Sequence, residues 1–196
     1  VATQTFPFLD ASEPTPRAAI PAGRRSAAHV LSLAAVWVTF ATSGIVFSEP
    51  APVDVLSAGL LVLLPVVGLT RTSPLLLTYL SLWLVAAAGA YLAATLSRDM
   101  ADSLTHTTVS LFLYLVSFVV AAFVARRPVA HTRLILSAWM FAGLLAGAAG
   151  LIGYMAALPG AYELFTKFGR AAGTFKDPNV FGPFLVPPFL YCLHVA

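Results

Sequence analysis

Six long apolar stretches, joined by short polar segments, dominate this sequence of 196 residues. They run over about His29–Phe47, Val53–Leu69, Pro74–Leu96, Thr107–Ala125, Leu134–Leu158 and Asn179–Ala196. About 20 consecutive apolar residues in a helix are enough to cross the hydrocarbon core of a bilayer. Backbone exposed to lipid must pair its own polar groups, which a helix does within one segment. The pattern therefore predicts an all-α, polytopic transmembrane helix bundle with five spans and a sixth begun.

The composition excludes an ordinary soluble domain. Charged residues make up only 10% of the chain, hydrophobic residues 59%, and the mean hydropathy is +0.88, whereas a soluble domain carries about 25% charged residues. We expect no nucleic-acid partner, because a basic excess in such a chain mostly records which loops stay in the cytoplasm. One cysteine and four scattered histidines show no ligand spacing, so we expect neither a metal site nor another cofactor.

The charges between the apolar stretches predict the orientation. Residues 1–28 are rich in Pro, Ala and Thr and lack an apolar run, so we expect a disordered cytoplasmic tail. No small-residue cleavage pattern follows the first apolar stretch, which favours an uncleaved span over a secretory signal. With the N-terminus in the cytoplasm, the inner loops hold seven basic residues and the outer loops four, as expected for positively charged cytoplasmic loops.

This topology places residues 159–178 in an outer, periplasmic loop that holds three of the four outer cations: Lys167, Arg170 and Lys176. Cations on the outer side run against the usual charge bias. A helix N-terminus flanked by cations is also a ready site for phosphate. The loop therefore predicts a substrate that carries phosphate at the membrane surface.

Within this loop, Ala161–Phe168 shows helical spacing of apolar residues, which predicts a short interfacial helix with Glu163 and Lys167 paired on its polar face. The loop then divides into two predicted groups. The residues expected to contact phosphate are Arg170, Lys176 and Asn179, and those expected to shape the site are Gly169, Gly173, Asp177 and Pro178.

Local chemistry supports these assignments. Glycines on both sides of Arg170 permit unusual backbone angles and close approach to a ligand. Asp177 is suited to cap the last helix, with Pro178 at its first position. An alternative stays open, in which the loop cations contact lipid headgroups or pair with Glu163 and Asp177.

The fifth apolar stretch carries a row of small residues that includes Gly143, Gly147, Gly150 and Gly153. Small residues four apart let helix backbones approach closely in lipid. Close helix packing is the favoured interpretation of this row, and a flexible hinge beside a substrate groove is the alternative.

The segment GRAAGTFKDPNVFGPF, residues 169–184, resembles the signature of the O-antigen ligase and polymerase family. That family comprises glycosyltransferases of the bacterial inner membrane that make polysaccharides. The resemblance implies a substrate glycan carried on undecaprenyl pyrophosphate and an acceptor such as another glycan or the lipid A core. It implies that Arg170 contacts the pyrophosphate and that Gly173, Pro178 and Asn179 shape the site.

Family members continue with further spans and a large outer loop that carries an essential histidine. The resemblance therefore implies an N-terminal portion that is inactive alone, with its general base outside this chain. His194 lies at membrane depth and cannot replace that histidine.

Two other functions stay open. A transporter or flippase subunit needs ionisable residues inside its spans, and Pro74–Leu96 and Leu134–Leu158 contain none. A non-catalytic membrane scaffold would leave the Arg170 loop without a chemical role. Helix bundles host many functions, so fold alone does not separate these alternatives.

Overall fold

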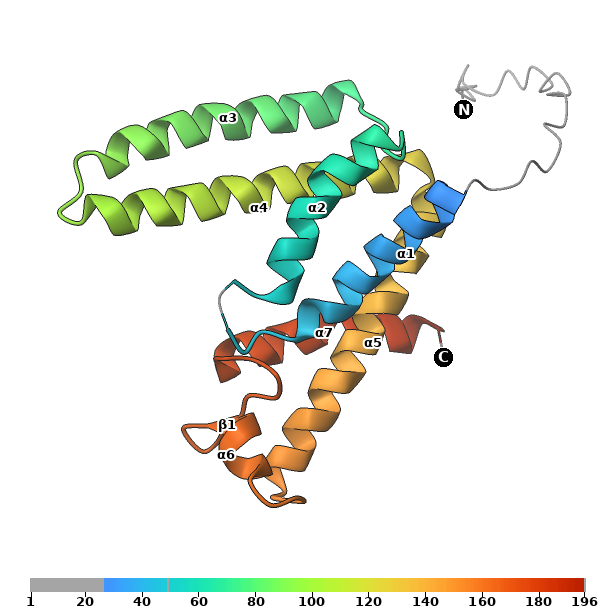
Figure 1. Ribbon diagram of the computed structural model, residues 1–196, viewed down its shortest axis with the longest axis vertical. Coiled ribbons are helices and arrows are strands. Elements are labelled where there is room, and N and C mark those ends of the chain that lie inside the picture. Colours follow the sequence, from blue (N-terminus) through green and yellow to red (C-terminus); the bar gives the residue numbers. More distant parts are fainter. Residues whose placement is uncertain (1–26, 49, 196) are drawn as a thin grey trace, which may run out of the picture.

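The computed structural model describes residues 27–48 and 50–195, and most of them are helical (Figure 1). The predicted tail, residues 1–28, lies outside the described residues except for its last two. Those two residues, Ala27 and Ala28, already belong to the first helix.

All six apolar stretches form helices, so the predicted all-α class is confirmed. The helices are α1 (Ala27–Ala41), the 3₁₀ turn η1 (Thr42–Gly44), α2 (Pro52–Val66), α3 (Pro74–Ala94), α4 (Met100–Arg126), α5 (Pro128–Tyr154), α6 (Ala161–Phe165) and α7 (Pro178–Val195). A two-stranded hairpin of β1 (Thr166–Lys167) and β2 (Arg170–Ala171) lies between α6 and α7.

Local signals set where several helices start. The Ser73 hydroxyl accepts a hydrogen bond from the Leu76 amide at 3.2 Å and caps α3, and Asp99 accepts one from the Asp102 amide at 3.1 Å and caps α4. Pro128 starts α5, where the missing N–H has no cost. Both α4 and α5 therefore begin before the spans predicted at Thr107 and Leu134.

Four helical segments of the described chain are long and apolar enough to cross a membrane: residues 27–44, α3, α4 and α5. Helix α2 is apolar but has only 15 residues, which corresponds to about 22 Å against a hydrocarbon core of about 30 Å. Helix α7 is continuous but contains three prolines, Pro183, Pro187 and Pro188. A multi-pass membrane protein is supported, while the fifth and sixth spans and the orientation stay predictions.

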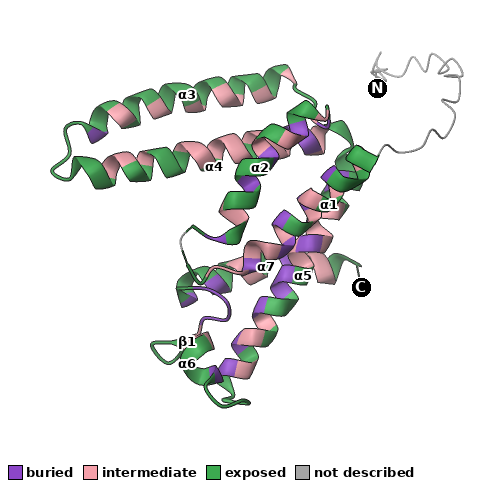
Figure 2. Ribbon diagram, in the orientation of Figure 1, coloured by how far each residue is buried: buried purple, intermediate pink, exposed green. Residues whose placement is uncertain are grey.

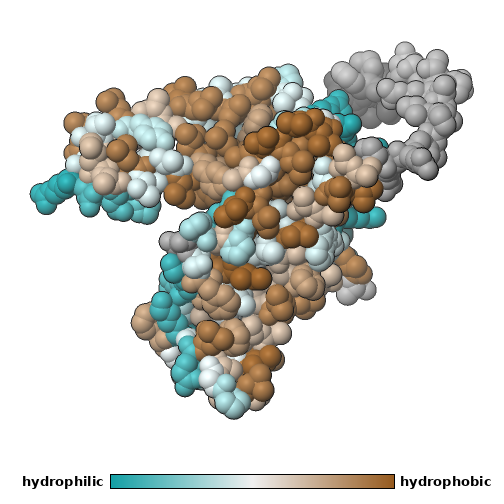
Figure 3. Space-filling view, viewed as in Figure 1, coloured by the Kyte–Doolittle hydropathy of each residue, from teal (hydrophilic) through white to brown (hydrophobic). Residues whose placement is uncertain are grey.

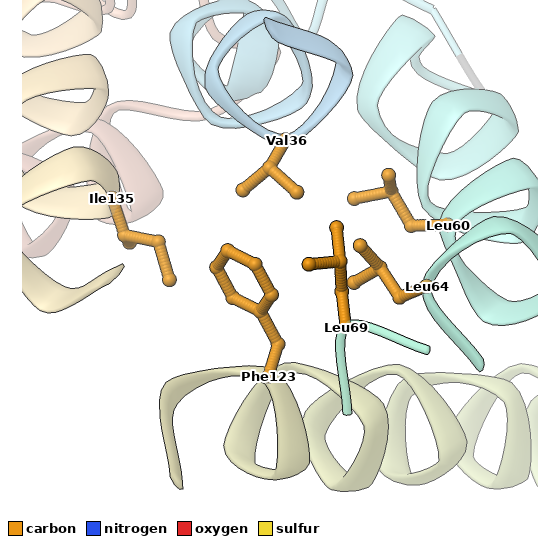
Figure 4. Close-up of a cluster of buried hydrophobic side chains, with 6 residues drawn as sticks. All are labelled: Val36, Leu60, Leu64, Leu69, Phe123 and Ile135. Atoms are coloured by element: carbon orange, nitrogen blue, oxygen red, sulfur yellow. The ribbon is translucent and has the colours of Figure 1, made fainter. Parts of the chain in front are cut away.

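The largest cluster of buried side chains joins four helices. It combines Val36 of α1, Leu60 and Leu64 of α2, Leu69 just beyond α2, Phe123 of α4 and Ile135 of α5 (Figure 4). Lipid tails are as apolar as these side chains, so van der Waals contact holds helices together in a membrane. A cluster with no polar member therefore depends on close packing.

Helices α3 and α4 form a long hairpin that projects from the other helices (Figure 1). Most of α3 is exposed (Figure 2), and hydrophobic residues cover much of the hairpin's visible face (Figure 3). Tyrosine hydroxyls join the two helices, from Tyr79 to Ser117 and from Tyr91 to Thr108, each at 3.0 Å. These bonds satisfy hydroxyl groups that would be costly to leave unpaired in lipid.

The glycines of α5 allow other elements to approach closely. A Cβ added at Gly150 would lie 2.7 Å from Cζ of Phe181, and one at Gly143 would lie 3.0 Å from Cβ of Pro188. At Gly153 the Cβ would meet Cβ of Phe165 at 2.5 Å, whereas Gly147 has ordinary space. The predicted role in close packing is therefore confirmed at three of the four positions.

The two ends of α5 offer a test of the topology. Its 27 residues span about 40 Å, so Thr132 near its start and Phe168 beyond its end should face opposite sides of the membrane. With Cys192 changed to Ser, a cysteine at Phe168 should react with an impermeant thiol reagent from outside, and one at Thr132 only after permeabilisation. The reverse pattern would invert the predicted orientation.

Candidate phosphate site at the start of α7

The segment between α5 and α7 is a short helix followed by a tight hairpin. Gly160 precedes α6 with φ 75°, and α6 ends at Phe165 after only five residues. The predicted helix over Ala161–Phe168 is therefore wrong beyond Phe165. Phe168 and Gly169 adopt φ of 56° and 70°, and two successive left-handed residues make the two-residue turn that suits a β-hairpin.

The hairpin places two cations opposite each other. Lys167 pairs with Arg170 in the register of β1 and β2, and directly opposed side chains lie about 5 Å apart at Cβ. Both side chains are exposed, and hydrophilic residues are visible along this edge of the molecule (Figure 3). The hairpin thus places two positively charged side chains next to each other on its exposed surface.

Each cation of the pair has a defined hydrogen-bond partner. Lys167 Nζ donates to the carbonyl oxygen of Lys176 at 3.0 Å, and Arg170 Nη1 donates to Oδ1 of Asn179 at 3.1 Å. The predicted pairing of Lys167 with Glu163 is wrong, because Lys167 lies beyond the helix and turns toward Lys176.

The chain after the hairpin is held firmly against the helices. The amides of Ala172 and Gly173 both donate to the carbonyl of Phe165, at 2.8 and 3.0 Å. The Thr174 hydroxyl donates to the carbonyl of Gly44 at the end of η1, and the Val46 amide donates to the carbonyl of Thr174 at 2.9 Å. The bond from Thr174 to Gly44 joins residues 130 apart in the sequence, and no local sequence signal indicates it.

Gly173 has a structural role that differs from the predicted one. Its φ is 58°, and a Cβ would lie 2.7 Å from the carbonyl oxygen of Ala146 and 2.7 Å from Cε2 of Phe181. The close approach predicted toward a ligand is thus an approach to α5 and α7. At Gly169 no atom lies within 4 Å of an added Cβ, so this glycine serves only the turn.

The start of α7 follows the predicted capping pattern. Asp177 Oδ1 accepts from the amide of Asn179 at 2.8 Å, and its carbonyl accepts from the amides of Val180 and Phe181. Pro178 begins the helix and is buried. Because these amides already have partners, they cannot cradle a phosphate as predicted, and the candidate contacts are the side chains of Arg170, Asn179 and Lys176.

The site therefore has a net positive charge and an exposed surface. Between the hairpin and the start of α7, three basic side chains outnumber one carboxylate, that of Asp177. The basic residues are Lys167, Arg170 and Lys176, and all four side chains are exposed. Arg170 uses one of its five N–H groups on Asn179, which fixes the guanidinium and leaves others to face a ligand. Such an arrangement can bind a phosphate group through charge-assisted hydrogen bonds.

His194 lies at the other end of α7, in its last turn. An 18-residue helix is about 27 Å long, so His194 is far from Arg170 and belongs to a separate groove with Arg133 and Tyr191. No described residue beside Arg170 is assigned as a general base.

Comparison with protein families, with proteins of known function and with solved structures finds no match to this chain.

The two site glycines provide a matched pair of variants. Both have positive φ, so Gly169→Ala and Gly173→Ala carry a similar backbone strain of about 1–3 kcal/mol. Gly173→Ala adds a clash with Ala146 and Phe181 and should lower the thermal midpoint clearly more than Gly169→Ala. Equal midpoints in a thermal scan of the detergent-purified protein would show that Gly173 is not packed against α5.

Proposed function

We propose that this chain is the N-terminal portion of a membrane glycosyltransferase of the O-antigen ligase or polymerase type. It would move a glycan from undecaprenyl pyrophosphate to an acceptor glycan or lipid A core at the outer face of a bacterial inner membrane. The observation that carries the proposal is the hydrogen bond between Arg170 and Asn179 at the start of α7, flanked by Lys167 and Lys176.

The proposed role of Arg170 is electrostatic. The acceptor hydroxyl attacks the anomeric carbon, the bond to the pyrophosphate oxygen breaks, and negative charge grows on the departing pyrophosphate. A guanidinium held in place stabilises this charge without having to reorganise. Its planar fork matches two phosphate oxygens, which an ammonium does not. The base that takes the hydroxyl proton belongs to residues outside this chain.

An apolar groove beside the site suits a lipid-linked donor. It lies between α5 and α7, has a volume of about 400 Å³, and is lined by apolar or small residues: Met140, Gly143, Leu144, Gly147, Ala148, Leu185, Pro188, Phe189 and Cys192. Leu185 lies six residues beyond Asn179 along α7, which is about 9 Å. A lipid whose phosphate meets Arg170 therefore finds apolar surface along the same helix.

Substitution of Arg170 tests this proposal in the longer enzyme to which the chain is assigned. Arg170→Ala should lower the transfer rate from a polyprenyl-pyrophosphate glycan about 100-fold or more, the usual cost of losing one donor to a developing anion. Arg170→Lys should restore little, because the two-pronged geometry is lost. The measurement is transfer by purified protein in detergent or vesicles.

Arg98→Ala is the matched control, since Arg98 is an exposed cation in the α3–α4 turn and its loss removes the same charge. It should change the rate less than about twofold, as expected for a remote surface charge. A non-catalytic scaffold would tolerate Arg170→Ala, and that result would refute the proposal. A larger loss from Lys167→Ala than from Arg170→Ala would move the phosphate contact to Lys167.

A further inference from the structure

The tip of the β1–β2 hairpin presents an aromatic side chain to its surroundings. Phe168 is the first residue of the turn and is 86% exposed, and no large hydrophobic side chain within residues 27–48 and 50–195 is more exposed. The hairpin lies in an exposed part of the molecule (Figure 2). A phenyl ring stabilises a fold by leaving water, so this ring contributes little to the folding of the described chain.

The backbone at the same position is also unfavourable for phenylalanine. Phe168 has φ 56° and Gly169 has φ 70°. Bulky residues rarely adopt this left-handed conformation, and a two-residue turn of this kind favours Asn followed by Gly. An asparagine at position 168 would therefore suit the fold better. Strained residues of this kind gather at functional sites, so Phe168 indicates a partner outside the described residues.

The packing of the hairpin indicates where that partner lies. A Cβ added at Gly153 would meet Cβ of Phe165 at 2.5 Å, and one at Gly150 would lie 3.6 Å from Cα of Gly173. Phe165 and Gly173 precede and follow the hairpin, so both of its ends pack against the last turns of α5.

Helix α5 has 27 residues and is about 40 Å long, against a hydrocarbon core of about 30 Å. Its last turns therefore lie where the acyl chains give way to lipid headgroups. The hairpin beside them lies at the same depth, instead of projecting into water.

The side chains near the tip suit this depth. Tyrosine is enriched at the membrane surface, and Tyr154 and Tyr162 are both exposed. Lys167 and Arg170 flank the turn, and Lys167 Nζ lies 5.6 Å from the centroid of the Phe168 ring. An apolar ring with cations beside it complements a lipid surface, because acyl chains accept the ring while phosphate groups attract the cations.

We propose that the β1–β2 hairpin is a membrane-surface anchor, which inserts the Phe168 ring between lipid headgroups and acyl chains. Lys167 and Arg170 contact the phosphate groups of the surrounding lipids. The backbone of the turn stays among the headgroups, so a short side chain at position 168 remains accessible to water. This inference does not depend on the proposed transferase activity.

Hydrogen exchange of the full chain in vesicles of phosphatidylcholine and phosphatidylglycerol tests the anchor. Phe168→Asn should speed exchange of residues 166–171 about threefold or more, because partial burial of a phenylalanine side chain is worth about a factor of ten and the better turn recovers only part of it. Phe168→Trp should keep the protection, because tryptophan favours the membrane surface. Mass spectrometry of the peptides that cover the hairpin measures both effects.

A hairpin without lipid contact predicts the opposite order, because asparagine suits the left-handed turn and tryptophan does not. Slower exchange in Phe168→Asn than in the wild type would therefore overturn the proposal. Leu96→Asn is the matched control, since Leu96 is 85% exposed in the turn between α3 and α4. It should leave exchange of residues 166–171 unchanged, and an equal increase there would show a general effect of lost apolar surface and overturn the anchor.

A photoreactive analogue, p-benzoylphenylalanine, placed at position 168 identifies what covers the ring. In the same vesicles, irradiation should give adducts of the hairpin peptide with phospholipid, detected by mass spectrometry. The adducts should be enriched in phosphatidylglycerol, because Lys167 and Arg170 attract anionic headgroups, and equal use of both lipids would overturn the role given to these cations. Adducts with a second copy of the chain, or none with lipid, would overturn the anchor itself.

Discussion

The packing of residues 172–175 between η1 and α5 is the constraint on which the arrangement of the hairpin and the start of α7 depends. Thr174 bonds backbone groups at Gly44 and Val46, while Gly173 presses its Cα against α5 and Phe181. Backbone groups buried in this way must all be paired, so the segment has little freedom to shift. It thereby fixes where α7 begins, and with it the distance between Arg170 and Asn179.

Helix α5 packs against elements from both halves of the chain. It packs against α1, α4, α6 and α7, and small residues on different faces make those contacts close. In lipid, van der Waals contact stabilises helix association more than the transfer of apolar surface does. Each glycine on α5 that faces a neighbour lets that neighbour approach more closely. The same helix, 27 residues long, separates the hairpin at one end from Arg127 at the other by about 40 Å.

The hairpin and the start of α5 differ in how exposed their basic side chains are. At the hairpin, Arg170 and the two lysines are exposed, so an anion there stays hydrated and can exchange, as a substrate must. At the start of α5, His131 is buried and stacked on Phe123. The basic hairpin and His131 therefore differ in their access to water.

The sequence by itself determined what depends on neighbours three or four residues apart. Apolar length predicted the helices, and the Asp177–Pro178 pair predicted how α7 starts. Such signals are readable because the interacting atoms belong to one turn of chain. The tertiary structure alone decided the left-handed turn at Phe168, the partner of Lys167 and the anchoring of Thr174. Those features arise from contacts between segments that are distant in the sequence. They depend on the shapes of the packed surfaces, which no local pattern encodes.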